Sequence, residues 1–185
     1  MLDDILKDAE NRMKKSTDAT HLELAAIRTG RANPALLDSI KVDYYGTLTP
    51  LRQIANVAAP DHRLLVLQVF DRNAVSAVDK AIKSSDLGLN PQIDGNLLRL
   101  PIPALTEDRR RDLVKYAHKI AEEGKVAIRN VRRDVNDMIK ELEREHEVSE
   151  DASHDAMDKV QRFTNKYIEQ IDGLLKNKEK EIMED

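Results

Sequence analysis

The sequence predicts an α+β protein in which a long three-helix bundle is interrupted by a small β/α/β domain. All six prolines lie between Pro34 and Pro103, so the flanking segments contain no residue that breaks a long helix. Apolar residues in those flanking segments recur at intervals of three and four, which is the spacing of one helix face. Between them, short apolar runs alternate with turn residues, as in a small sheet. We therefore expect two domains, with residues 1–30 and 105–185 forming the bundle and residues 31–104 forming the insert.

The first helix is expected to run from the N-terminus to near Gly30, because glycine commonly ends helices in a left-handed conformation. Its apolar stripe weakens where Ser16 and Thr20 take two of the positions. The stripe consists of Leu2, Ile5, Ala9, Met13, Ser16, Thr20, Leu24 and Ile27.

The second helix is expected to begin after Thr106, a capping residue type that Glu107 and Asp108 follow in the first turn. Acids in that turn complement the positive end of the helix dipole. A regular four-three stripe predicts packing at a shallow angle against neighbouring helices, and the small Gly124 within it favours a close approach. The stripe consists of Ala117, Ala121, Gly124, Ile128, Val131, Val135, Met138 and Leu142.

A third helix is expected to begin at Ser149, where Glu150 and Asp151 again follow a capping residue. The connection around Val148 is short, which predicts that the second and third helices are antiparallel neighbours. Its stripe consists of Ala156, Val160, Phe163, Tyr167, Ile171, Leu174 and Ile182.

The insert is predicted to combine strands with one helix. Residues 39–45 alternate between polar and apolar side chains before Gly46, which indicates a strand that ends in a turn. Residues 64–70 form a more continuous apolar run that is typical of a buried strand. Asn73 is expected to cap a helix that extends to Ile82, and residues 97–100 are predicted to form the last strand.

Composition excludes several classes of protein. There is no cysteine, so the chain has no disulfide, no thiolate nucleophile and no cysteine-based zinc site. The histidines are scattered, and no G-x-S-x-G nucleophile motif occurs. We therefore expect no catalytic residue, no metal and no cofactor. No apolar run approaches the ~20 residues of a membrane span, and the N-terminus lacks the pattern of a signal peptide. We expect a cytoplasmic monomer without a membrane partner.

A basic segment of the second helix is the strongest functional signal. Between Arg109 and Arg133 there are nine basic residues and three acids, a local net charge of +6. At 100° per residue, several of these cations share an arc beside the apolar stripe. Such a face favours a phosphate-rich partner, because arginine donates paired hydrogen bonds to phosphate oxygens. Few acids stand at the spacing that would pair these cations along the helix. With only 3% aromatic residues, structured RNA fits better than stacked single strands.

Three alternatives remain open. The basic face could be a solvated surface with salt bridges inside the helix. The chain could also be a helical adaptor or chaperone-like protein whose bundle grips a partner, and such binding would survive charge reversal on the arginine face. An enzyme with an unrecognised site in the insert would instead show a pocket with convergent titratable groups.

Five motifs spread over the whole chain resemble those of bacterial ribosome recycling factor. The motifs are Ile27-Arg-Thr-Gly-Arg-Ala-Asn-Pro34, Asp43-Tyr-Tyr-Gly-Thr47, Ser85-Asp-Leu-Gly-Leu-Asn-Pro91, Leu105-Thr-Glu-Asp-Arg-Arg-Arg111 and Ala127-Ile-Arg-Asn-Val-Arg-Arg-Asp134. One departure is Gly124, at a position where the family usually keeps a better helix former.

The resemblance implies a long three-helix bundle and a small β/α/β domain, joined by two linkers in an L-shaped molecule. It implies a factor that is not an enzyme and that binds the post-termination ribosome. The bundle would lie against large-subunit ribosomal RNA near the peptidyl site. Together with elongation factor G and GTP hydrolysis by that factor, the protein would split the ribosome into subunits and release mRNA and tRNA.

The resemblance also suggests which residues act. Arg132 is the principal candidate for binding ribosomal RNA, and the remaining candidates lie on the same helix or near the end of the first helix. A hinge is expected where the chain leaves the bundle and returns to it, because Gly30 permits unusual dihedral angles and the prolines restrict the return segment. The further RNA-binding candidates are Arg129, Arg110, Arg133, Lys125, Arg28 and Arg31, and the hinge candidates are Thr29, Gly30, Arg31, Pro101, Pro103 and Leu105.

Overall fold

The computed structural model describes residues 1–184, which form two compact units. One unit consists of residues 1–28 and 107–184, and the other consists of residues 29–106. Asp185, which the sequence analysis included in the bundle, lies outside the described residues. Gly30 and Leu105, which the sequence pattern placed at the ends of the bundle segments, fall within residues 29–106 and lie close to each other.

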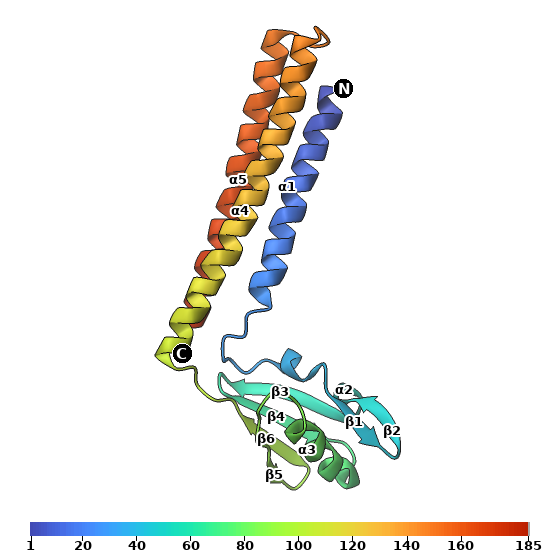
Figure 1. Ribbon diagram of the computed structural model, residues 1–185. Coiled ribbons are helices and arrows are strands. Elements are labelled where there is room, and N and C mark those ends of the chain that lie inside the picture. The colour runs from blue at the N-terminus through green and yellow to red at the C-terminus, as the bar shows by residue number, and fades with distance from the viewer. Residues whose placement is uncertain (185) are drawn as a thin grey trace. The chain divides into compact units, whose positions relative to one another are not determined.

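The first unit is a bundle of three long helices, α1 (Leu2–Ala25), α4 (Glu107–Arg144) and α5 (Glu150–Met183), which lie side by side (Figure 1). α4 has 38 residues, so it is about 57 Å long at 1.5 Å per residue. α4 and α5 are joined by a short turn and run antiparallel, as the short connection predicted.

The helix ends agree with the sequence in part. Ser149 caps α5 as predicted, since its Oγ accepts a hydrogen bond from the Ala152 N–H at 3.1 Å. The predicted cap of the first helix at Gly30 is wrong, because α1 already ends at Ala25 and Ala26 follows it as the capping residue. Gly30 does adopt a left-handed conformation, with φ of 76°, but it does so within the insert. A β-carbon at this position would lie 2.8 Å from Leu105 Cγ, so the close approach of Leu105 explains the glycine.

The predicted stripes drift relative to the buried faces. Ile139 is fully buried in α4, whereas the predicted Met138 is 47% exposed. Leu6 is buried in place of Ile5, and Thr164 in place of Phe163. A strict four-three spacing repeats every 3.5 residues, whereas a straight helix repeats every 3.6, so the predicted face moves off the true one. The main apolar core comprises Leu6, Ala9, Met13, Ala121, Ile128, Val131, Val135, Ile139, Ala156, Val160, Tyr167 and Ile171.

The core contains a polar section where α1 meets α4. Thr17 and Thr20 are buried, and each hydroxyl donates a hydrogen bond to the backbone carbonyl four residues earlier, at 3.0 and 2.9 Å. Gly124 faces Thr20 and Ile171 so closely that a β-carbon built on it would overlap Thr20 Oγ1. This contact confirms the close helix approach that the glycine predicted.

The second unit contains two antiparallel sheets. In the smaller sheet, β1 (Lys41–Tyr44) pairs with β2 (Thr47–Pro50). The larger sheet has the strand order β3-β4-β6-β5. Its strands are β3 (Ala55–Asp61), β4 (Leu64–Val69), β5 (Gln92–Asp94) and β6 (Leu97–Pro101), and the remaining elements are α2 (Leu51–Ile54), α3 (Val75–Lys83), and the 3-10 helices η1 (Pro34–Leu37) and η2 (Arg72–Ala74).

The core of this unit lies between the larger sheet and α3. Leu65 and Leu67 of β4 and Leu98 of β6 are fully buried on one sheet face, and they share a core with Val78 and Ile82 of α3. The predicted cap at Asn73 is wrong. Asp71 takes that role, because its Oδ1 accepts a hydrogen bond from the Asn73 N–H at 2.9 Å and begins η2 ahead of α3.

Candidate nucleic-acid interface

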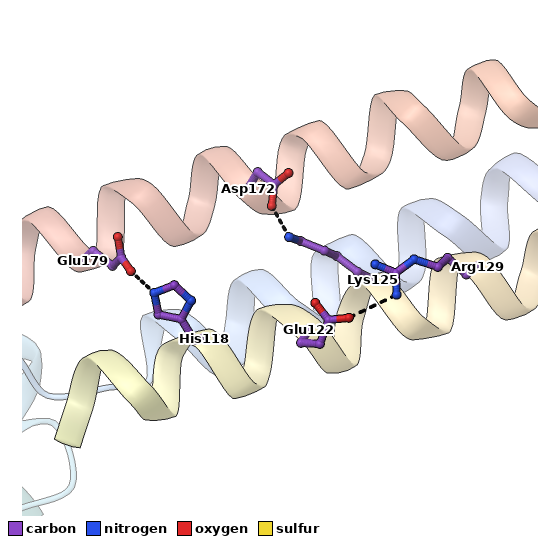
Figure 2. A network of polar contacts seen from close by, with 6 residues as sticks. All are labelled: His118, Glu122, Lys125, Arg129, Asp172 and Glu179. Atoms are coloured by element: carbon purple, nitrogen blue, oxygen red, sulfur yellow. Dashed lines mark hydrogen bonds and ion pairs between the residues drawn. The ribbon is translucent and has the colours of Figure 1, made fainter. Parts of the chain in front are cut away.

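α4 carries most of the predicted RNA-binding residues, and α5 supplies partners for some of them. Lys125 forms an ion pair with Asp172 of α5, and only 19% of its side chain is exposed (Figure 2). Arg129 Nη1 donates to Glu122 Oε1 at 3.1 Å. Neither pair follows from three- or four-residue spacing along α4, because Asp172 lies on the neighbouring helix and Glu122 lies seven residues before Arg129. These two cations are therefore partly neutralised within the bundle.

Arg132 has a different environment. Its Nη1 donates a hydrogen bond to Gln161 Oε1 of α5 at 3.2 Å, and Gln161 Nε2 donates to Asn165 Oδ1 at 2.8 Å. Gln161 is a neutral amide, so it orients the guanidinium without cancelling its charge, and Asn165 in turn holds Gln161. Arg132 thus has a hydrogen bond that orients its guanidinium and no carboxylate partner among residues 1–184, and both features suit an arginine that binds phosphate.

The remaining RNA-binding candidates in the bundle are Arg133, Arg110 and Arg28, and they lie in three different environments. Arg133 is exposed, and no ion pair to it occurs within residues 1–184. Arg110 Nη1 contacts the backbone oxygen of Met183 at 3.4 Å, at the end of α5 where helix carbonyls carry partial negative charge. Arg28 lines an open cavity of about 510 Å³ between the end of α1 and the first turns of α4, together with Arg109 and Tyr116.

Arg31 and the hinge candidates belong to the unit of residues 29–106. The N–H of Ala32 donates to the oxygen of His62, and the N–H of Ile102 donates to the oxygen of Arg63, both at 2.7 Å. Pro101 is the last residue of β6 and pairs with Leu64. The outgoing and returning segments are thus tied to the turn between β3 and β4, and the hinge assignment stays a prediction.

The insert contains one cluster of titratable groups, around Asp71. The hydroxyls of Tyr45 and Tyr44 donate to Asp71 Oδ2 at 2.8 and 3.2 Å. The hydrogen bond from Tyr45 lowers the pKa of Asp71, and the contact with Asp71 raises the pKa of Tyr45. These shifts move both groups further from neutral pH, which is the opposite of what an acid–base catalyst needs.

Tyr45 lies in a tight turn. It has φ of 50° and Gly46 has φ of 84°, so the two residues form the left-handed turn that joins β1 to β2. Within residues 1–184 no group of three or more histidine or carboxylate side chains is placed to hold a metal ion. None of the described helices has the length and apolar character of a membrane span.

Comparisons with known proteins point to one family. The family described as Ribosome recycling factor matches residues 20–183. The ribosome-recycling factor of Thermomicrobium roseum is 57% identical over 184 residues, and that of Syntrophomonas wolfei is 52% identical, with 100% of both chains covered in each case. A solution structure of ribosome recycling factor superimposes with a TM-score of 0.73 at 48% identity, covering 98% of this chain and 97% of that one.

A second solved structure shows a relative among its partners. It is a model of the Thermus thermophilus ribosome recycling factor and the Escherichia coli elongation factor G bound to the E. coli post-termination complex. It matches with a TM-score of 0.62 and 48% identity, covering 100% of both chains.

Proposed function

The chain belongs to the ribosome recycling factor family, and on that premise we propose that it binds the post-termination ribosome and splits it into subunits. It does so together with elongation factor G, which hydrolyses GTP, and mRNA and tRNA are released for a new round of translation. The relative that binds the post-termination complex alongside elongation factor G supports this proposal. The protein itself hydrolyses nothing, and it acts as a cytoplasmic monomer.

The bundle binds large-subunit ribosomal RNA near the peptidyl site through the basic face of α4. The observation that carries this assignment is the environment of Arg132, whose guanidinium contacts a neutral amide and retains its charge. Arg133, which is exposed, adds a second full charge beside it. Arg129 and Lys125 contribute less, because each must leave an internal carboxylate before it can bind a phosphate. Arg110, Arg28 and Arg31 complete the predicted set.

Elongation factor G exerts force on the small domain. The hinge segments at Thr29–Arg31 and Pro101–Leu105 allow this domain to rotate relative to the bundle. Movement has to be confined to the residues nearest the bundle, because Ala32 and Ile102 are hydrogen-bonded to the β3–β4 turn. We take residues 1–28 with 107–184 as the anchored domain and residues 31–104 as the moving one, with the hinge in the residues between them.

The direct test is the splitting of post-termination ribosomes, followed by light scattering with elongation factor G and GTP. Wild-type protein is expected to split them, and Arg132→Ala is expected to need a higher protein concentration for the same rate. Arg144→Ala is the matched control, because it removes the same charge at the last residue of α4, where Arg144 pairs with Glu141.

Each outcome has a distinct meaning. If the wild-type protein fails with a matched elongation factor, the recycling function is wrong and the helical adaptor becomes the better hypothesis. If wild type and Arg132→Ala split ribosomes equally, the function stands but Arg132 is not the anchor. Equal losses in Arg132→Ala and Arg144→Ala would indicate a diffuse charge effect without a defined site.

A further inference from the structure

Three side chains of α4 face α5 at intervals of seven residues, which is close to two helical turns. His118 contacts Glu179 and Lys125 contacts Asp172, as Figure 2 shows. Arg132 contacts Gln161. The first two positions of this row therefore end on a carboxylate of α5, and the third ends on an amide.

The antiparallel register makes this difference specific. From His118 to Lys125 the partner moves seven residues back along α5, from Glu179 to Asp172. The same step beyond Lys125 leads to Arg132 on α4 and to Asn165 on α5. An asparagine thus stands where the row would place the next acid. Gln161, one turn further along, accepts the hydrogen bond from Arg132 and donates one to Asn165.

The neighbours of Arg132 on its own helix are also free of acids. The positions three and four residues away are Ile128, Arg129, Val135 and Asn136. Since i,i+3 and i,i+4 pairs are the ones that meet on a helix surface, none of these can neutralise the guanidinium. Arg129, one turn earlier, does have an acid partner in Glu122. Neither α4 nor α5 therefore places a carboxylate against the guanidinium of Arg132.

We propose that Gln161 and Asn165 are positioning residues of the RNA-binding site, which orient Arg132 while leaving its charge available for a phosphate of ribosomal RNA. This inference rests on the proposed binding of ribosomal RNA by Arg132. Both amides are exposed, so a phosphate that reaches Arg132 also passes beside them. A carboxylate at either position would form an ion pair with the guanidinium and compete with the phosphate.

The test converts each amide to the acid of the same shape, Gln161→Glu and Asn165→Asp, and measures binding to purified large ribosomal subunits over a range of salt concentrations. Each variant is expected to bind about 10- to 100-fold more weakly, since a hydrogen bond to a charged group contributes that much. The salt dependence should also flatten, by about 0.7–0.9 in the slope of log K against log salt, because one phosphate contact is lost.

Two comparisons separate positioning from general effects. Asn177→Asp adds the same charge at an exposed position of α5 and is expected to bind like wild type. The thermal midpoint of Gln161→Glu should be equal to or above that of wild type, because the new carboxylate gains a partner in Arg132. A residue with only a structural role would lower stability and binding together. In an Arg132→Ala background, Gln161→Glu should have no further effect on binding.

The outcomes distinguish this inference from the function on which it rests. If Arg132→Ala binds large subunits as tightly as wild type, the proposed RNA anchor is wrong. If Arg132→Ala weakens binding but both acid variants bind like wild type, the positioning role is overturned and the anchor stands. Equal losses in the Asn177→Asp control would overturn it as well, because net charge alone would then explain the effect.

Discussion

Replacing Gly124 with alanine is expected to destabilise the bundle, although alanine is the better helix former. In a helix with free space around it, this substitution stabilises by about 1 kcal/mol. At Gly124 the space is already occupied. The added β-carbon would overlap Thr20 Oγ1 and lie 3.2 Å from Thr20 Cβ and 3.1 Å from Ile171 Cδ1.

Neither neighbour can move without loss. Thr20 is 4% exposed, and its hydroxyl is held by a 2.9 Å hydrogen bond to the oxygen of Ser16. Rotating it away would leave a buried hydroxyl unsatisfied, at about 1–3 kcal/mol. Shifting α1 or α5 outwards instead would strain a packed core by about 1–3 kcal/mol. After the gain in helix propensity of about 1 kcal/mol is subtracted, the net loss should be up to about 2 kcal/mol.

Urea unfolding followed by circular dichroism measures this loss, and the chain supplies its own control. Gly173 lies on the exposed side of α5, and a β-carbon there would have no atom within 4 Å. Gly173→Ala should therefore stabilise the protein by about 0.4–1 kcal/mol. Adding Thr20→Ala to Gly124→Ala removes the overlapping hydroxyl, so the double variant should lose less than the sum of the two single changes.

A stabilisation by Gly124→Ala similar to that of Gly173→Ala would refute this reasoning. The glycine would then be only a poor helix former, and the contact between α1 and α4 would be loose enough to accept a methyl group.

Two further predictions concern the insert. The pKa of Asp71 is lowered by the hydrogen bonds from Tyr45 and from the Asn73 N–H, so its stabilising effect is present above its ordinary value of 3.8 and is lost as the pH falls through the lower folded value. Asp71→Asn should thus be less stable than wild type at neutral pH, and the difference in unfolding free energy should shrink below pH 3.8; a difference independent of pH would contradict this. Gly30→Ala must adopt φ of 76° and crowd Leu105, so it should leave ribosome binding intact but slow splitting if this segment is the hinge. Unchanged splitting, measured by light scattering, would remove Gly30 from the hinge.

The parts of the fold that could be predicted depend on short-range chemistry. Ser149 caps α5 because a hydroxyl and a backbone N–H three residues apart meet in any helix start. The strand at Leu64–Val69 is evident from its apolar run. β3 was missed because most of its residues are exposed, and β2 has no fully buried residue, so neither strand carries an apolar pattern. Asp71 was passed over in favour of Asn73 because both are good capping residues and only the backbone path distinguishes them.

The candidate RNA-binding site also has some features that the sequence predicts and others that only the folded structure shows. The basic segment of α4 and its position beside the apolar stripe can be inferred from residue types and helical spacing, since these follow from the period of one helix. The choice of Arg132 within that segment came from the resemblance to the family and stays a prediction. Which of these cations have a carboxylate partner cannot be inferred in this way. Lys125 is paired by Asp172 and Arg132 is oriented by Gln161 across a helix contact, between residues that are far apart in the chain. The register of α5 against α4 depends on how two complete apolar faces pack, so only the folded bundle reveals that Arg132 faces amides where its neighbours in the row face acids.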